Sequence, residues 1–214
     1  MLSINSKLFL SALIFFIFSN CNNFENVKIR NIKTKVIESD SFIVKKYIVT
    51  FPIKEIKDTF LSINNILEKD FFVEKKLCPI ELSEQIALML SMSNIDDVYY
   101  LGRINNNSLF FIQHEFGQLL VIISKQYNEI CAADIIAMEL GEDDSILIYS
   151  KLLKNVISKK EIKMKDNNDE KGTLFVQKIT IINEIISDCN FRRVGEITKI
   201  INKKVLYKDL EKLE

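Results

Sequence analysis

Hydrophobic and polar residues repeat with two different periods along this chain, and these periods predict its helices and strands. Residues 41–51 are rich in β-branched and aromatic side chains, which indicates a strand that ends at Pro52. Apolar residues then recur every three or four positions in residues 53–67, which predicts a helix. The same spacing after Pro79, in residues 79–93, predicts a second helix, because Pro is tolerated in a first helical turn.

A period of two begins near residue 96 and predicts a run of antiparallel strands joined by short turns. The expected strands are residues 98–104, 108–114, 119–125, 145–150 and 173–182. Residues 130–140 fit a strand or a helix, and the turn and strand that follow them favour a hairpin. Residues 151–165 are charged and ambiguous, and residues 165–172 form a polar loop.

The C-terminal segment, residues 190–214, returns to helical spacing. Its apolar residues lie three or four positions apart, with Lys and Glu between them, at Val194, Ile197, Ile201 and Val205. This spacing predicts one long amphipathic helix that packs against the sheet. The whole pattern therefore predicts an α+β fold, with an antiparallel sheet of about six to seven strands, two N-terminal helices and a long C-terminal helix.

The first twenty residues have the features of an export signal. Lys7 precedes an almost wholly apolar run over residues 8–18, which is shorter than the roughly 20 residues needed to span a bilayer. Residues 18–21, Phe-Ser-Asn-Cys, resemble a bacterial lipobox of the relaxed kind familiar in spirochaete lipoproteins. The usual motif has Leu at the first of these positions and Gly or Ala before the cysteine. An ordinary signal peptide with an incidental cysteine is the alternative.

The lipobox resemblance implies removal of residues 1–20, a lipid on Cys21 and a place in the cell envelope. Residues 21–40 are polar and suit a tether between a lipid anchor and a fold. Residues 41–214 then form a single α+β domain, which is long enough to bury a sizeable core.

The predicted order of elements is similar to the helix-grip fold of the START-like superfamily. In that fold a curved antiparallel sheet wraps a long C-terminal helix. The strand, Pro and helix around Pro52 look like the opening of such a domain, although Phe60 matches only loosely the aromatic residue that follows this Pro in many members. The resemblance implies a cavity for a lipid or another hydrophobic molecule. The residues expected to line it are Phe111, Leu120, Ile122, Phe175, Ile179 and Ile201. The alternative is that these side chains simply fill a core.

Charge and cysteine content narrow the class of protein. The chain has 29 basic and 29 acidic residues, so its formal net charge is zero, which argues against a nucleic-acid-binding protein. If Cys21 carries lipid, an odd number of cysteines remains: Cys78, Cys131 and Cys189. Their apolar neighbours favour buried free thiols, and one disulfide stays open as the alternative for an exported protein.

No arrangement of residues indicates catalysis, a cofactor or a metal. The single histidine, His114, has no second histidine to share a metal, and neither a serine-hydrolase elbow nor a phosphate-binding glycine loop is present. Acidic residues gather near a turn at Glu139, Glu142, Asp143 and Asp144, where a solvated hairpin tip is expected rather than a cation site.

The sequence thus favours a lipid-anchored envelope lipoprotein that binds a hydrophobic small molecule such as a lipid. It would contact the membrane through its N-terminal lipid and would have no nucleic-acid partner. The alternative is a surface or periplasmic lipoprotein that binds another protein and has no ligand cavity. An enzyme is not expected, since no acid, base and nucleophile grouping is visible.

Overall fold

The computed structural model of the protein describes residues 39–45, 47–68, 76–93, 95–141, 144–166, 173–187 and 189–213. All of these belong to the second of two units into which the chain divides, Met1–Val36 and Ile37–Glu214. The expected signal peptide, Cys21 and most of the expected tether lie outside the described residues, as does most of the polar loop at residues 165–172. No described helix has the length and apolar character needed to cross a membrane.

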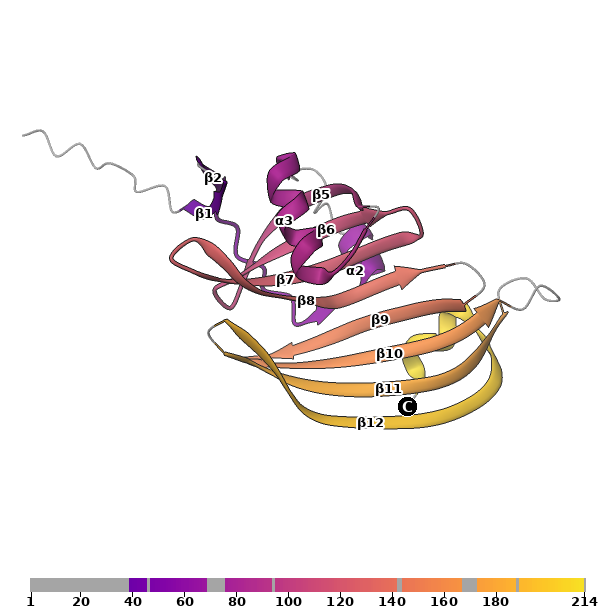
Figure 1. The fold of residues 1–214 in the computed structure, drawn as a ribbon. Coiled ribbons are helices and arrows are strands. Elements are labelled where there is room, and N and C mark those ends of the chain that lie inside the picture. The colour runs from indigo at the N-terminus through magenta and orange to yellow at the C-terminus, as the bar shows by residue number, and fades with distance from the viewer. Residues whose placement is uncertain are drawn as a thin grey trace, which may run out of the picture. The chain divides into compact units, whose positions relative to one another are not determined.

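Antiparallel strands dominate the described part of the chain, so the predicted α+β fold is wrong (Figure 1). Ten strands form one sheet in the order β12-β11-β10-β9-β8-β7-β6-β5-β4, with β3 also paired to β9, where six or seven were expected. Its first strands are β3 (Phe60–Leu61), β4 (Lys76–Leu77), β5 (Ile95–Ile104), β6 (Asn107–His114) and β7 (Gly117–Gln126). The sheet continues through β8 (Glu129–Leu140), β9 (Asp144–Leu153), β10 (Val156–Asp166), β11 (Thr173–Ser187) and β12 (Asn190–Leu206).

Most of the predicted strands are confirmed, and the ambiguous residues 151–165 fall mainly in β10. The strand expected at residues 41–51 is instead a separate hairpin of β1 (Ser39–Val44) and β2 (Tyr47–Pro52), with Lys45 at positive φ in its turn. Ser39 and Asp40, which the sequence analysis placed in the tether, are the first residues of β1.

The second predicted helix is confirmed as α3 (Ile80–Leu90), with Pro79 at its N-cap. The first predicted helix is present only at its end, as α2 (Ile63–Glu68). The residues before α2 are extended because their backbone pairs with Arg103. The Ile56 amide donates to the Arg103 carbonyl at 2.8 Å, and the Arg103 amide donates to the Lys54 carbonyl at 2.8 Å. These tertiary hydrogen bonds override the helical spacing of residues 53–62.

The predicted long C-terminal helix is wrong, and the helix-grip arrangement is wrong with it. Residues 190–206 form β12, which pairs with β11 over its whole length, and only a short 3-10 helix, η3 (Tyr207–Lys212), follows. Of the four residues expected to pack against the sheet from a helix, Val205 is buried and Ile201 is half-buried, while Val194 and Ile197 are exposed.

The sheet carries separate apolar clusters on its two faces. One face of β5–β8 packs against α3 and the β1–β2 hairpin through residues such as Phe42, Leu82 and Phe110. The opposite face packs against α2 and the ends of β9–β11. A third cluster joins the far strands to η3, around Ile162, Ile179 and Leu210. The fold therefore places the junction between β8 and β9 among the three clusters.

Candidate functional site

A cleft lies beside the end of the sheet where β8 and β9 are paired with each other. In the described sheet these two strands share three residue pairs, Met138 with Ile148, Glu139 with Leu147 and Leu140 with Ile146. Beyond that point β9 leaves β8 and pairs with the short strand β3 instead. Figure 1 shows the two strands diverging.

The cleft has a volume of about 520 Å³, which is within the usual range for small-molecule sites. Its walls come from β7–β11, α2 and η3 and are largely apolar. The lining residues are Asn64, Phe116, Gly117, Gln118, Glu139, Leu140, Gly141, Ser145, Ile146, Leu147, Met164, Leu174 and Tyr207. Leu147 and Met164 are almost fully buried and form its floor, whereas Phe116 and Tyr207 are partly exposed at its mouth.

A close backbone approach fixes the position of Glu139. Gly117 has φ +153, and a Cβ atom there would collide with the carbonyl oxygen of Glu139. The Gly141 amide also donates to the Phe116 carbonyl at 3.0 Å, which holds the end of β8 against the turn before β7. A residue larger than glycine at position 117 would push this end of β8 away from β7.

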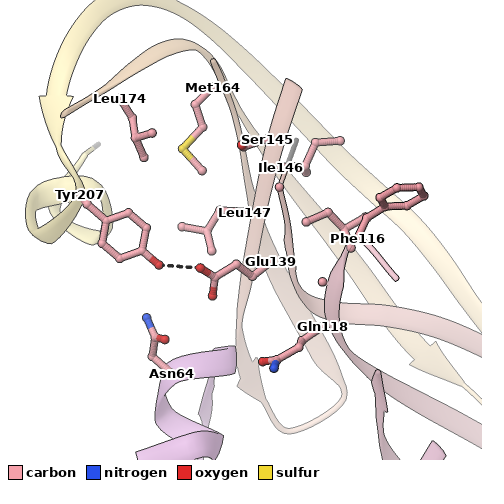
Figure 2. Close-up of a pocket in the computed structure, with 13 residues that line it drawn as sticks. Asn64, Phe116, Gln118, Glu139, Ser145, Ile146, Leu147, Met164, Leu174 and Tyr207 are labelled. Carbon is pink, nitrogen blue, oxygen red and sulfur yellow. Dashed lines mark hydrogen bonds between the residues drawn. The ribbon is translucent and has the colours of Figure 1, made fainter. Parts of the chain in front are cut away.

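Glu139 and Tyr207 form the polar centre of the cleft. The Tyr207 hydroxyl donates to Oε1 of Glu139 at 2.8 Å. In the view of Figure 2, Leu147, Met164 and Leu174 lie on one side of this hydrogen bond, and the Asn64 and Gln118 amides lie on the other. One cleft thus offers an apolar wall next to a carboxylate and two amide groups.

A smaller cavity of about 270 Å³ adjoins the cleft. The two share Asn64, Glu139, Leu147 and Tyr207, and the smaller one continues towards η3, where Lys208 and Leu210 line it. The hydrogen bond between Tyr207 and Glu139 therefore lies at the boundary between a larger apolar space and a smaller, more polar one.

The six residues expected to bind a ligand lie elsewhere in the fold. Phe111, Leu120 and Ile122 are fully buried together in the cluster beneath α2. Ile179 is buried in the cluster beside η3, and Ile201 is half-buried against that cluster. Phe175 is half-buried on β11. None of the six is among the described residues that line the cleft.

Glu139 is the one cleft residue that the sequence analysis singled out, as a member of an acidic group near a turn. Of the other three acids in that group, Glu142 and Asp143 lie outside the described residues, as does the side chain of Asp144. The large aliphatic and aromatic lining residues come from one turn, four strands and η3, with one or two from each, so no spacing in the sequence connects them.

A buried carboxylate, Asp40, anchors the β1–β2 hairpin to the sheet. Asp40 has no exposed surface and accepts hydrogen bonds from the Tyr100 hydroxyl at 3.0 Å and the Ser108 hydroxyl at 2.6 Å. The Lys125 ammonium also donates to it, and burial lowers the pKa of that lysine. Asp40 and Ser108 are both inaccessible to solvent, so this group stabilises the fold rather than forming a reactive site.

A second buried ionic group joins the two parts of the sheet. Lys159 of β10 contacts Asp134 of β8 and Glu184 of β11, the latter at 2.7 Å. The pKa of the Asp134 carboxyl is raised to about 6, because burial and the neighbouring Glu184 raise it by more than Lys159 lowers it. Nearby, the Ser150 hydroxyl donates to the Ile136 carbonyl at 2.5 Å. These contacts hold β9, β10 and β11 close to β8 in the region where β9 no longer pairs with β8.

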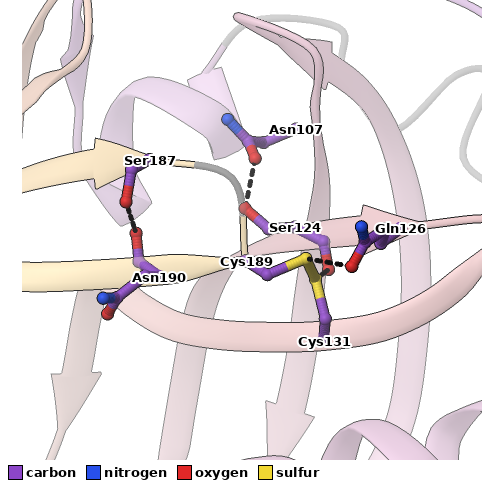
Figure 3. The surroundings of a disulfide bond; sticks show 7 residues. All are labelled: Asn107, Ser124, Gln126, Cys131, Ser187, Cys189 and Asn190. Atoms are coloured by element: carbon purple, nitrogen blue, oxygen red, sulfur yellow. Dashed lines mark hydrogen bonds between the residues drawn. A yellow bond between two sulfur atoms is a disulfide. The ribbon is translucent and has the colours of Figure 1, made fainter.

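A disulfide joins Cys131 on β8 to Cys189 in the turn between β11 and β12 (Figure 3). Their Cα atoms are 5.1 Å apart and 58 residues separate them in sequence. The sequence analysis favoured free thiols, and for this pair that interpretation is wrong. Cys78 is a buried free thiol, and burial raises its pKa to about 12, which makes it unreactive.

His114 contacts backbone groups and shows no arrangement for catalysis. Its Nε2 atom lies 2.9 Å from the Ser93 carbonyl, and its Nδ1 atom accepts from the Phe116 amide at 3.3 Å. Within the described ranges, no three His, Cys, Asp or Glu side chains are grouped as metal ligands.

Comparison of the chain with protein-family models, with curated proteins and with solved structures finds no match. The geometry of the cleft is therefore the basis for assigning a function.

Proposed function

We propose that this protein is an exported, lipid-anchored protein of the cell envelope whose folded domain binds a hydrophobic small molecule with a polar end. The observation that carries the proposal is the cleft of about 520 Å³ beside the paired ends of β8 and β9, with apolar walls and a carboxylate beside them. Sites for small molecules commonly combine a mainly apolar lining with a few polar groups that fix orientation.

The expected affinity follows from the apolar contact area. Each buried methylene of an alkyl chain contributes about 0.8 kcal/mol. A chain with ten buried methylenes would therefore gain roughly 8 kcal/mol, and an association cost of about 4 kcal/mol would leave binding near the millimolar range from the alkyl chain alone.

Export and anchoring rest on the signal-like N-terminus, and the disulfide supports them. Disulfides persist mainly in oxidising compartments, so the Cys131–Cys189 bond fits a protein that has left the cytoplasm. A lipid on Cys21 would hold the cleft near a membrane, which is a source of hydrophobic molecules.

Substitution of Cys21 tests the anchor. Cys21→Ala removes the thiol to which the lipid would be attached, so the protein is expected to move from the detergent phase to the aqueous phase in a phase-partition assay. Cys78→Ala is the matched control and should stay in the detergent phase. Equal partitioning of the unsubstituted protein and Cys21→Ala would contradict lipid attachment at this residue.

Titration with a neutral fluorescent apolar probe, N-phenyl-1-naphthylamine, tests the cleft. Leu174 is half-buried in the cleft wall, so Leu174→Gln keeps its approximate size but places an amide against the ligand. We expect saturable binding to the unsubstituted protein and a loss of roughly tenfold or more in affinity for Leu174→Gln.

Ile200→Gln is the control, since Ile200 is 73% exposed on β12 and does not line the cleft. It should leave probe binding unchanged. Absence of saturable binding to the unsubstituted protein, or a loss that follows Ile200→Gln instead, would reject the cleft as the binding site.

A protein-interaction module is the second candidate, and the exposure of β12 favours it. β12 is 17 residues long and ends the described sheet, and its exposed side chains include Val194, Ile197 and Ile200. An edge strand of this length offers backbone groups to a strand of another protein. Basic side chains along β12 also protect such an edge from unwanted pairing, so the cleft is the stronger basis for a function.

A further inference from the structure

The charge of the cleft restricts the kind of molecule that it accepts. Among the described residues that line the cleft, Glu139 alone carries a formal charge. The described Lys208 lines the adjoining smaller cavity and not the cleft itself. A carboxylate accepts hydrogen bonds but cannot donate them. The polar end of a ligand in this cleft therefore meets a negatively charged acceptor.

Glu139 retains capacity for such a ligand. A carboxylate offers about four acceptor positions, and the Tyr207 hydroxyl occupies one of them. The hydrogen bond to Tyr207 also orients the carboxylate at the boundary between the cleft and the smaller cavity. A donor group placed there would have its alkyl chain beside Leu147, Met164 and Leu174.

We propose that the cleft selects amphiphiles with a positively charged amine at the polar end and discriminates against those with a carboxylate. This inference rests on the proposed function. An ammonium group can donate to Glu139 and neutralise it, whereas a ligand carboxylate would be repelled at close range in a partly water-excluded site. The formal net charge of the chain is zero, so long-range attraction of cations by the whole protein does not produce the same preference.

Three ligands of equal chain length test the selection: decylammonium, decanol and decanoate. Isothermal titration of the purified protein at neutral pH, below the micelle concentration of each ligand, gives the three affinities. We expect decylammonium to bind roughly tenfold or more tightly than decanoate, with decanol between them.

Two variants show which group is responsible. Glu139→Gln removes the charge with little change in size, and the amide can still accept from Tyr207, so the preference for decylammonium over decanoate should fall to within roughly threefold while decanol binding persists. Tyr207→Phe keeps the carboxylate and should keep the preference. Glu129→Gln is the matched control, because Glu129 is an exposed acid at the opposite end of the same strand.

The outcomes separate this inference from the proposed function. Binding of all three ligands with equal affinity, or a preference that is the same in Glu139→Gln, would overturn the charge selection and leave a hydrophobic site. Tighter binding of decanoate than of decylammonium would overturn the selection as well. Failure of all three ligands to bind would overturn the proposed function, and the charge selection with it.

Discussion

Single buried side chains decide much of the stability of this domain. A buried ionic group joins β8 to β10 and β11 and consists of Lys159, Asp134 and Glu184. Its one lysine cannot fully neutralise two carboxylates. Burial therefore raises the pKa of Asp134 to about 6 from an ordinary value of 3.8. The native protein binds this proton more tightly than the unfolded chain does.

The raised pKa of Asp134 predicts a pH dependence with a definite sign. The stabilisation is fully present below the unfolded-state pKa of 3.8 and is lost as the pH rises through about 6. The loss amounts to at most about 3 kcal/mol, since one pKa unit corresponds to about 1.4 kcal/mol. Urea denaturation at several pH values between 4 and 7 measures the effect, and Asp134→Asn should flatten the decline.

Asp209→Asn is the control for this measurement. Lys212 lowers the pKa of the exposed Asp209 carboxyl, so its linkage to folding has the opposite sign. Removal of Asp209 should therefore leave the decline in place. A decline that persists unchanged in Asp134→Asn would show that another group produces it.

At the scale of elements, β12 shows why the sequence predicted a helix where a strand forms. Its apolar residues lie three and four positions apart, but the pairing of β11 with β12 shifts register at two places, which breaks the alternation expected of a strand. Both faces of β12 are mostly exposed, so burial does not impose a period of two either. The signal that favoured a strand was composition, since Ile197, Thr198 and Ile200 are β-branched.

Exposure along β12 predicts which substitutions the fold tolerates. Ile197 and Ile200 are 67% and 73% exposed, so Ile197→Thr and Ile200→Thr keep β-branching and should change the free energy of unfolding by no more than about 0.5 kcal/mol. Ile179 on β11 is buried, so Ile179→Ala should lower the free energy of unfolding by about 2–4 kcal/mol. Urea denaturation measures the free energy of unfolding of all three variants. A large loss in either Thr variant would mean that β12 is packed on both sides.

Local patterns predicted other elements well. Residues 119–125 begin with five consecutive apolar residues, as expected of a central strand, and β7 is indeed buried on both faces over this run. Pro79 marked the start of α3. Ser62 is the sequence signal for the start of α2, because its hydroxyl caps that helix by accepting from the Asn65 amide at 3.2 Å.

At the scale of the whole domain, the site could not be predicted because it depends on how distant strands meet. The cleft lies beside the paired ends of β8 and β9, and its walls combine residues from Asn64 on α2 to Tyr207 on η3. The disulfide and the Lys159 group then fix the far strands to β8. Each of these contacts joins segments tens of residues apart, and periodicity along one element carries no information about them.

The central claim is that the cleft beside the paired ends of β8 and β9 holds the alkyl chain of a ligand. Photolabelling tests it most directly, with a decylamine that carries a diazirine at mid-chain and with peptide mapping by mass spectrometry. The account predicts labels on Leu147, Met164 or Leu174 that disappear when excess unlabelled decylamine is present. Labels confined to the exposed β12 side chains Ile197 and Ile200, or cleft labels that excess decylamine does not reduce, would contradict it.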